Sequence, residues 1–250
     1  MMPPKILVAA DSKMGKTSLL ATLANAGYNL RVMDFDNGAE ILDDYLTPEG
    51  MERTSILTFE DDSPDLRTGT SAWGKFQNVF INGWKDSEED LGKLSTWTSQ
   101  DVLAIDTLSF MARAAMRFAI RTAGRSPETQ AQIQDYGELA RLVESKIAWL
   151  TSRAFPGCLV VNTHITTIED EMGRSRMYPA ALGKAIPLVC ARYFNSLIRL
   201  DRKITKNGNE LVIRTVSDTK MALGTSVPNK LEPEEPPDLS LLFEKIRGDS

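Results

Sequence analysis

The sequence predicts an α/β fold with a mostly parallel central sheet flanked by helices and with antiparallel strands toward the C-terminal side. Short apolar runs at 5–10, 102–106 and 157–161 have the composition of fully buried parallel strands, and each leads into polar residues. Segments with helical spacing separate these runs, as in folds where strands and helices alternate. An Asn-Gly-Asn turn at 207–209, between two further strand-like segments, predicts an antiparallel hairpin.

The composition indicates a soluble globular chain with one main domain. The chain has 250 residues, of which 42% are hydrophobic and 25% are charged. We expect a main domain over 1–227 and a Pro- and Glu-rich tail over 228–250 that ends in a short amphipathic segment, 239–246. No apolar run is long enough to cross a membrane and no signal peptide is evident, so we expect a cytoplasmic protein. Cys158 and Cys190 have no metal or disulfide spacing and are expected to be reduced core residues.

The first apolar run leads directly into a phosphate-binding motif. Read from Ala10, the motif is A-x-x-x-x-G-K-T, and a helix-forming segment follows it. Gly15 allows the backbone to approach phosphates closely, Lys16 is expected between the β- and γ-phosphates, and Thr17 is an expected ligand of Mg²⁺. Ala10 stands where the motif usually has Gly, which makes the first turn slightly less permissive. The expected nucleotide contacts are Ala10, Asp11, Ser12, Lys13, Met14, Gly15, Lys16, Thr17 and Ser18.

Two further strands are expected to end in carboxylates. The strand at 30–35 leads into Asp34-Phe35-Asp36, and open parallel sheets place their chemistry at such carboxyl ends. The strand at 102–106 ends in Asp106, which fits the second nucleotide motif, whose carboxylate holds Mg²⁺ directly or through water. Between them we expect a helix at 41–46, a strand at 56–59, a surface loop at 60–70, a helix at 72–83 and an acidic segment at 86–90.

Four arginines follow Asp106 at a spacing of four residues. We expect the helix after Asp106 to carry Arg113, Arg117, Arg121 and Arg125, with their side chains on one face. That face is either solvated or a track for a phosphate backbone, and the spacing does not decide between them. The net charge of −5 argues against coating nucleic acid by bulk charge, but a local basic face remains compatible with it.

The remaining landmarks lie in the second half of the chain. We expect a long helix from Ser126-Pro127-Glu128 that buries Leu139, Leu142, Val143, Ile147 and Leu150. The strand at 157–161 ends in Asn162-Thr163-His164. The histidine has either a structural role or a contact with the terminal phosphate. We expect a mobile surface loop at 166–179, a helix at 180–190, and strands at 193–200 and 210–216.

In this order the motifs resemble the RecA-like ATPase core, in particular small phage-encoded RecA-like ATPases associated with single-strand annealing. The resemblance covers about residues 5–220. It rests on four motifs, which are A-x-x-x-x-G-K-T at 10–17, M-D-F-D-N-G at 33–38, V-L-A-I-D-T at 102–107 and L-V-V-N-T-H at 159–164. A weaker match is A-A-L-G-K-A-I-P at 180–187. It implies that Asp36 is the catalytic carboxylate, although the family usually has Glu there, with Asp34 as the alternative. It also implies that His164 is the phosphate sensor.

The same resemblance implies two sites outside the nucleotide pocket. The loop at 165–178, which carries Arg174 and Arg176, corresponds to the loop that meets DNA. The segment at 218–224 resembles one that completes a neighbouring subunit's site with a basic residue, here Lys220.

These observations together lead us to expect an ATP-binding, Mg²⁺-dependent ATPase that assembles into a ring or filament. We expect it to act on single-stranded DNA in recombination or annealing, with a single-strand-binding or helicase protein as a further candidate partner. One alternative is a loader or motor subunit that acts on a protein such as a replicative helicase. Another is a nucleotide-dependent scaffold with little hydrolysis. A nucleotide kinase is disfavoured because no Arg-rich lid lies near the phosphate loop.

Overall fold

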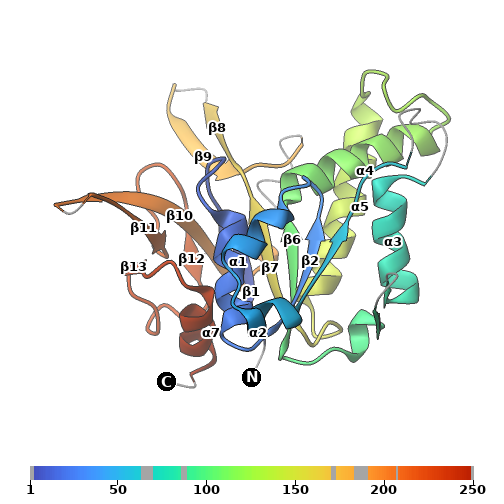
Figure 1. Ribbon diagram of the computed structural model, residues 1–250. Coiled ribbons are helices and arrows are strands. Elements are labelled where there is room, and N and C mark those ends of the chain that lie inside the picture. Colours follow the sequence, from blue (N-terminus) through green and yellow to red (C-terminus); the bar gives the residue numbers. More distant parts are fainter. Residues whose placement is uncertain are drawn as a thin grey trace.

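A nine-stranded sheet forms the centre of the molecule (Figure 1). The computed structural model describes residues 3–62, 70–85, 89–169, 173–182, 191–206 and 208–248. The strands are β1 (Lys5–Ala9), β2 (Asn29–Asp34), β3 (Thr54–Thr58), β4 (Trp84–Lys85), β5 (Asp90–Gly92), β6 (Asp101–Asp106), β7 (Cys158–Thr163), β8 (Ile165–Glu169), β9 (Ser175–Pro179), β10 (Ser196–Thr205), β11 (Gly208–Arg214), β12 (Gly224–Thr225) and β13 (Glu234–Glu235). The helices are α1 (Lys16–Asn25), α2 (Pro48–Glu52), α3 (Ala72–Asn82), α4 (Leu108–Thr122), α5 (Ile133–Thr151) and α7 (Leu239–Arg247), with 3₁₀ turns η1 (Ala39–Asp44), η2 (Leu94–Thr96) and η3 (Ala191–Tyr193).

The strand order of the central sheet is β13-β11-β10-β1-β7-β6-β2-β3, with β12 also paired to β10. The strands β10, β1, β7, β6, β2 and β3 run parallel to one another. The remaining strands pair antiparallel, β11 and β12 with β10, and β13 with β11. The predicted class, a mostly parallel sheet with antiparallel strands on the C-terminal side, is therefore confirmed. The strand that carries the phosphate loop, β1, is separated from β6 by β7.

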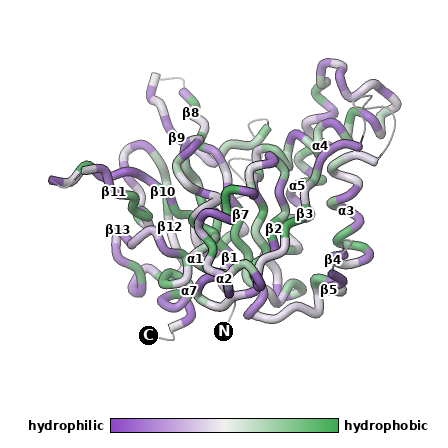
Figure 2. The backbone as a smooth tube through the Cα atoms, in the orientation of Figure 1, coloured by the Kyte–Doolittle hydropathy of each residue, from purple (hydrophilic) through white to green (hydrophobic). Residues whose placement is uncertain are grey.

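Helices cover the sheet on both faces. Because side chains alternate along a strand, Leu7 belongs to the apolar core under α3, α4 and α5, whereas Ile6 and Val8 belong to the core under α1 and α7. Figure 1 shows these two helical layers on opposite sides of the strands, and Figure 2 shows hydrophobic residues concentrated along the central strands. Parallel strands buried on both faces are near-continuous in apolar residues, as the sequence predicted.

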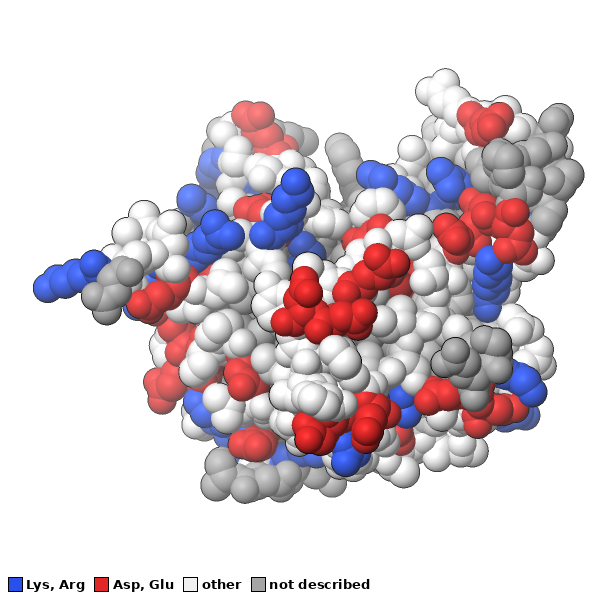
Figure 3. All heavy atoms as spheres, in the orientation of Figure 1, with Lys and Arg blue, Asp and Glu red and all other residues white. Residues whose placement is uncertain are grey.

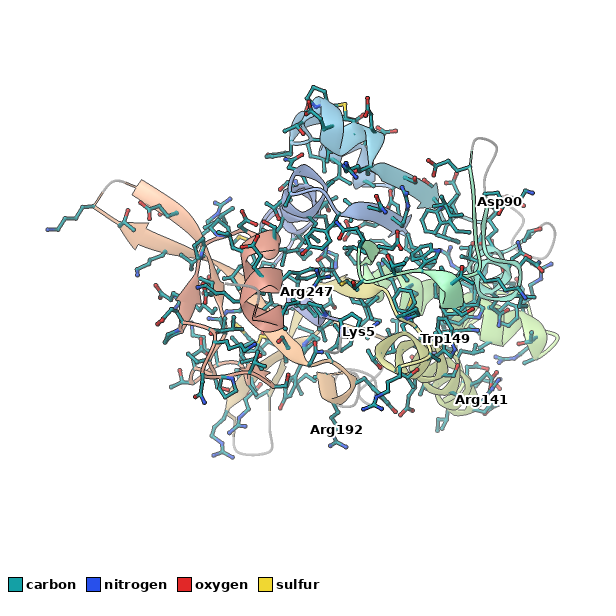
Figure 4. The ribbon with its side chains drawn as sticks, turned by 90° about the horizontal axis from the view of Figure 1, so that it is seen from below. Lys5, Asp90, Arg141, Trp149, Arg192 and Arg247 are labelled. Carbon is teal, nitrogen blue, oxygen red and sulfur yellow. The ribbon has the colours of Figure 1, made fainter. Side chains whose placement is uncertain are left out.

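The amino-terminal edge of the sheet is tied together by buried polar contacts. Lys5 is almost fully buried, and its Nζ donates hydrogen bonds to the carbonyl oxygens of Phe155 (2.9 Å) and Gly157 (2.6 Å). Arg247, at the end of α7, donates to Oη of Tyr28 (3.1 Å) and to the carbonyl oxygen of Ser99 (2.5 Å). Figure 4, seen from below, shows the labelled Lys5 and Arg247 at this end of the molecule.

The C-terminal residues are part of the packed structure. β13 pairs with β11, and the predicted amphipathic end forms α7, which packs against α1. Asp238 caps α7 through its side chain, and the backbone N–H of Leu239 donates to Oγ1 of Thr22 in α1. The buried face of α7 consists of Leu239, Leu242, Phe243 and Ile246. In the part of the chain described, no helix is long and apolar enough to cross a membrane.

Two secondary-structure predictions are wrong. The segment predicted as a loop at 166–179 is a hairpin in which β8 and β9 pair in register from Ile165–Pro179 to Glu169–Ser175. The long helix starts at Ile133 rather than at 126–128, because Gln132 and Asp135 form a capping box that satisfies the first backbone N–H groups there. The helix predicted at 180–190 falls largely on 183–190, outside the described residues, as does Cys190, whereas Cys158 is buried as predicted.

Candidate nucleotide-binding site

The phosphate loop lies at the carboxyl edge of the sheet, between β1 and α1. Lys13 and Gly15 both have positive φ, at 61° and 87°, so the loop turns sharply before the helix begins. Gly15 caps α1 without any side-chain hydrogen bond, which leaves N–H groups of the first turn free to bind an anion. A Cβ atom at Gly15 would lie 3.1 Å from Oγ of Ser18 on a backbone conformation that side chains rarely adopt. The loop therefore has the shape that the motif predicted.

Lys16 folds back across the loop. Its Nζ donates hydrogen bonds to the carbonyl oxygens of Asp11 (2.8 Å) and Ala10 (3.3 Å). Burial lowers the pKa of Lys16, and the nearby carboxylates of Asp106, Asp36 and Asp11 oppose that shift. Both contacts are to neutral backbone oxygens, so the ammonium group can exchange them for phosphate oxygens without breaking an ion pair.

Thr17 and Asp106 are joined directly. Oγ1 of Thr17 donates to Oδ2 of Asp106 at 2.6 Å, which leaves the lone pairs of the hydroxyl available to a cation. Asp106 is fully buried. Burial raises its pKa, whereas hydrogen bonds from Thr17 and Asn162 lower it. The sequence motifs assign no role to Asn162, whose one sequence signal is its position at the end of a buried strand.

The two carboxylates after β2 have different environments. Asp34 is buried, and its oxygens accept backbone N–H groups of Asp36 (3.1 Å), Gly38 (3.4 Å) and Ala39 (3.0 Å), so it organises the turn. Asp36 lines the pocket, and its Oδ1 is buried without a hydrogen-bond partner. Burial, together with the neighbouring carboxylates of Asp106 and Asp34, raises the pKa of Asp36 to about 7. Of the two candidates, only Asp36 offers an oxygen to a ligand in the pocket.

A pocket of about 400 Å³ brings together most of the residues predicted to bind the nucleotide or take part in hydrolysis. Its walls are Ser12, Lys13, Gly15, Lys16, Thr17, Ser18, Asp36, Ile41, Tyr45, Thr107 and His164. His164 is half-buried, and its ring lies 6.1 Å from that of Phe110 in an edge-on arrangement. Burial lowers the pKa of His164, and the positive charges of Lys16 and Arg113 lower it further. Ile41 and Tyr45 line the pocket but were not predicted, because an exposed 3₁₀ turn gives no periodic signal.

The residues present fit Mg²⁺ as well as a nucleotide. Within the described ranges no cluster of three or more His, Cys, Asp or Glu side chains could enclose a metal ion. Mg²⁺ does not need such a cluster, because it usually keeps several waters and takes one or two protein oxygens together with substrate phosphates. Thr17 and Asp106 could supply two such oxygens beside the loop that would hold the phosphates.

The predicted nucleic-acid residues lie outside this pocket. Arg117 donates to Oδ2 of Asp61 (3.1 Å), and the guanidinium of Arg113 lies over the ring of Phe110, 4.8 Å from its centre. Arg125 lies beyond the last residue of α4 and forms an ion pair with Asp135, so the prediction that it shares a helix face with Arg121 is wrong.

Three further predicted residues are exposed on or beside the β8–β9 hairpin. They are Arg174, Arg176 and Lys220, of which only Arg176 lies within a strand of the hairpin. The backbone carbonyl of Lys220 accepts a hydrogen bond from the N–H of Met177 at 2.7 Å, so its turn is joined to β9. Figure 1 shows this hairpin projecting from the edge of the sheet that carries the pocket.

Comparison with known proteins gives one family match and several remote structural similarities. A family model described as AAA domain matches residues 2–223. No curated protein sequence matches the chain significantly.

The similar solved structures include flagellar accessory protein FlaH from Methanocaldococcus jannaschii, with 10% identity, TM-score 0.44, and coverage of 93% of this chain and 84% of that one. The RadB recombinase has 15% identity, TM-score 0.42, and coverage of 85% and 81%. A KaiC-like protein from Pyrococcus horikoshii has 12% identity, TM-score 0.39, and coverage of 84% and 77%.

Proposed function

The chain belongs to the AAA domain family, and we propose that it is a Mg²⁺-dependent ATPase with a RecA-like core, which hydrolyses ATP to ADP and phosphate. The observation that carries this proposal is the joint placement of Lys16, Thr17 and Asp106 beside an open helix N-terminus. These groups are the ones that phosphoryl transfer requires for holding phosphates and a metal ion.

In the proposed reaction, backbone N–H groups of the loop and the ammonium of Lys16 bind the phosphates. Thr17 and Asp106 would hold Mg²⁺, which would neutralise charge on the phosphate oxygens. Asp36 orients a water molecule toward the γ-phosphorus and accepts its proton as the new P–O bond forms and the bond to the β-phosphate oxygen breaks. His164 contacts the terminal phosphate and lies immediately before β8, so it links the state of the nucleotide to the hairpin.

The finer part of the proposal concerns the substrate that hydrolysis acts on. We assign single-stranded DNA, in phage-type recombination, annealing or replication, because the hairpin with exposed Arg174 and Arg176 projects from the edge that carries the pocket. Assembly into a ring or filament would place Lys220 of one subunit at the site of its neighbour, as the RecA-like resemblance implies. A basic side chain there would neutralise charge on the transferred phosphoryl group.

A second candidate is a loader or motor subunit that acts on a protein partner. Figure 3 shows acidic side chains gathered at the centre of one face, over η1 and α2, where Glu40, Asp43, Asp44, Glu49 and Glu52 are exposed. An acidic surface beside the pocket repels a phosphate backbone and suits a basic protein surface. A scaffold that binds ATP with little hydrolysis is the remaining alternative, because Asp36 is shorter than the usual Glu.

The test is ATP hydrolysis at several protein concentrations, with and without single-stranded DNA, and with Lys16→Ala as the inactive control. A rate per subunit that rises with concentration and again with DNA would support the assembled, DNA-dependent enzyme. A rate that DNA leaves unchanged would favour the loader. The absence of Mg²⁺-dependent hydrolysis under all conditions would contradict the ATPase proposal and leave the scaffold.

A further inference from the structure

Asn162 lies in the interior of the molecule, directly beneath the nucleotide site. It belongs to β7, the strand between β1 and β6, and is opposite Val8 in the register with β1. Its side chain is 1% exposed. It faces α1, as Val160 does two residues earlier in the same strand. Asn162 therefore occupies the space between the phosphate loop and the second nucleotide motif.

The amide group of Asn162 joins these two motifs. Its Nδ2 donates to Oδ1 of Asp106 and to the backbone carbonyl of Lys16, both at 3.2 Å. Thr17 already holds the other carboxylate oxygen, Oδ2. Two donors on two oxygens fix both the position and the rotation of the carboxyl group, which one donor alone would not do.

The acceptor atom of the same amide is not used. Oδ1 of Asn162 is buried and has no hydrogen-bond partner. An unpaired buried polar atom costs about 1–3 kcal/mol, so Asn162 is an unfavourable choice for stability at the end of a strand whose preceding residues, 158–161, are apolar. Stability alone does not explain this residue, whereas a requirement to hold Asp106 and the start of α1 together does.

We propose that Asn162 is a positioning residue for the Mg²⁺ site, which sets the carboxylate of Asp106 and the first turn of α1 at the separation that bound Mg²⁺ requires. This inference rests on the proposed ATPase function. Asn162 contacts the carboxylate that would hold the metal, and it is not among the residues lining the pocket. Its loss is expected to weaken Mg²⁺ binding, because outer contacts that orient metal ligands typically contribute 10- to 100-fold to affinity.

The chain offers a matched control at the opposite edge of the sheet. Nδ2 of Asn29, at the start of β2, donates to Oδ1 of Asp101, at the start of β6, at 2.9 Å. This pair also joins an amide to a carboxylate between strands of the same sheet, but far along the strands from the phosphate loop. Asn29→Leu therefore reports what the loss of such a bond does to folding without touching the nucleotide site.

The experiment measures the melting temperature of the full chain with a non-hydrolysable ATP analogue while Mg²⁺ is titrated from an EDTA-treated sample. Asn162→Leu keeps the volume and removes the donor, and Asn162→Ser serves if the leucine variant does not fold. We expect the Mg²⁺ concentration at half-maximal stabilisation to rise about tenfold or more in the Asn162 variant. Asn29→Leu should lower the melting temperature and leave that midpoint within about twofold of wild type.

An Asn162 variant with the wild-type Mg²⁺ midpoint would overturn the inference, whatever its melting temperature without ligand. A wild-type protein that shows no Mg²⁺-dependent stabilisation by the nucleotide analogue would instead contradict the proposed function, and the inference with it. The wild-type titration therefore separates failure of the positioning role from failure of the function on which it rests.

Discussion

The hydroxyl of Thr17 lies 2.6 Å from Oδ2 of Asp106, although 89 residues separate them in the sequence. The two meet because β1 and β6 run in the same direction and end at the same edge of the sheet, with β7 between them. Thr17 lies in the first turn of the helix after β1, and Asp106 is the last residue of β6. The contact therefore depends on the sheet topology rather than on either motif alone.

Asp106→Asn is expected to reduce Mg²⁺-dependent ATP hydrolysis by about 10- to 100-fold, because it removes the negative charge beside the proposed metal. Thr17→Val removes the partner hydroxyl and should have an effect of similar size. Since the two groups act on one ion, the double variant should lose little more than the worse single variant. Steady-state hydrolysis rates for the three variants test this, and fully additive losses would show that the two residues act separately.

Asp36→Asn is expected to keep nucleotide binding and lose turnover, because the amide cannot accept a proton from water. Asp34→Ala should instead destabilise the fold by about 1–3 kcal/mol, since it leaves three backbone N–H groups of the turn without their acceptor. Binding of a fluorescent ATP analogue, hydrolysis and denaturant unfolding distinguish the two variants. Unchanged hydrolysis in Asp36→Asn would show that another residue orients the attacking water and accepts its proton.

The raised pKa of Asp36 predicts opposite effects of pH on activity and stability. Between its ordinary value of 3.8 and its folded value of about 7, the folded state keeps a proton that the unfolded state has lost. The contribution of Asp36 to the free energy of unfolding therefore falls as pH rises through this window and is level above it. Hydrolysis should rise with pH through about 7, because only the carboxylate accepts a proton.

The measurement for this prediction is a pair of pH profiles, one for hydrolysis and one for unfolding by urea, in wild type and Asp36→Asn. The difference in stability between the two proteins should depend on pH below about 7 and become constant above it. A pH-independent difference would show that Asp36 ionises normally in the folded protein.

The strand-tip residues were predictable because each belongs to a local pattern. Lys16, Thr17 and Asp106 follow apolar runs with recognisable spacing, and parallel strands bring such ends to one edge. Asn162 was not predictable as a contact of Asp106, because its role arises from the order of β1, β7 and β6 in space. No local spacing in the sequence encodes that order.

The wrong predictions for 166–179 and for Arg125 also arise from features of the fold that local sequence spacing does not encode. The segment after His164 is polar and was predicted as a loop, but backbone pairing between β8 and β9 needs no apolar alternation when both faces of a hairpin are partly exposed. Arg125 was placed on a helix by its spacing, yet the helix ends at Thr122 and the arginine turns to Asp135. Charge spacing predicts a shared face only where the helix continues.

Phe243→Ala in α7 is expected to cost about 3–5 kcal/mol, because the ring is fully buried and packs edge-on against Tyr28 at 5.6 Å between ring centres. Leu241→Ala is the control, since Leu241 is 41% exposed on the same helix. Denaturant unfolding of both variants provides the test. A small loss for Phe243→Ala would indicate that residues 228–250 act as a separable tail, as the predicted domain boundary at 227 suggested.

The last prediction concerns single-stranded DNA. Arg174 and Arg176 are exposed on the projecting hairpin, and Arg117 lies on α4, outside the hairpin. A double change of Arg174 and Arg176 to Ala should therefore weaken DNA binding and reduce the dependence of log affinity on log salt by about 1–2, because each phosphate contact on a single strand contributes roughly 0.7 to the slope. Arg117→Ala is the comparison variant and should change the slope less, because Arg117 lies on α4 and not on the hairpin. Fluorescence anisotropy of a labelled oligonucleotide at several salt concentrations measures both. If wild type and both variants show the same dependence of log affinity on log salt, the hairpin does not contact DNA. That result would favour the protein-partner alternative.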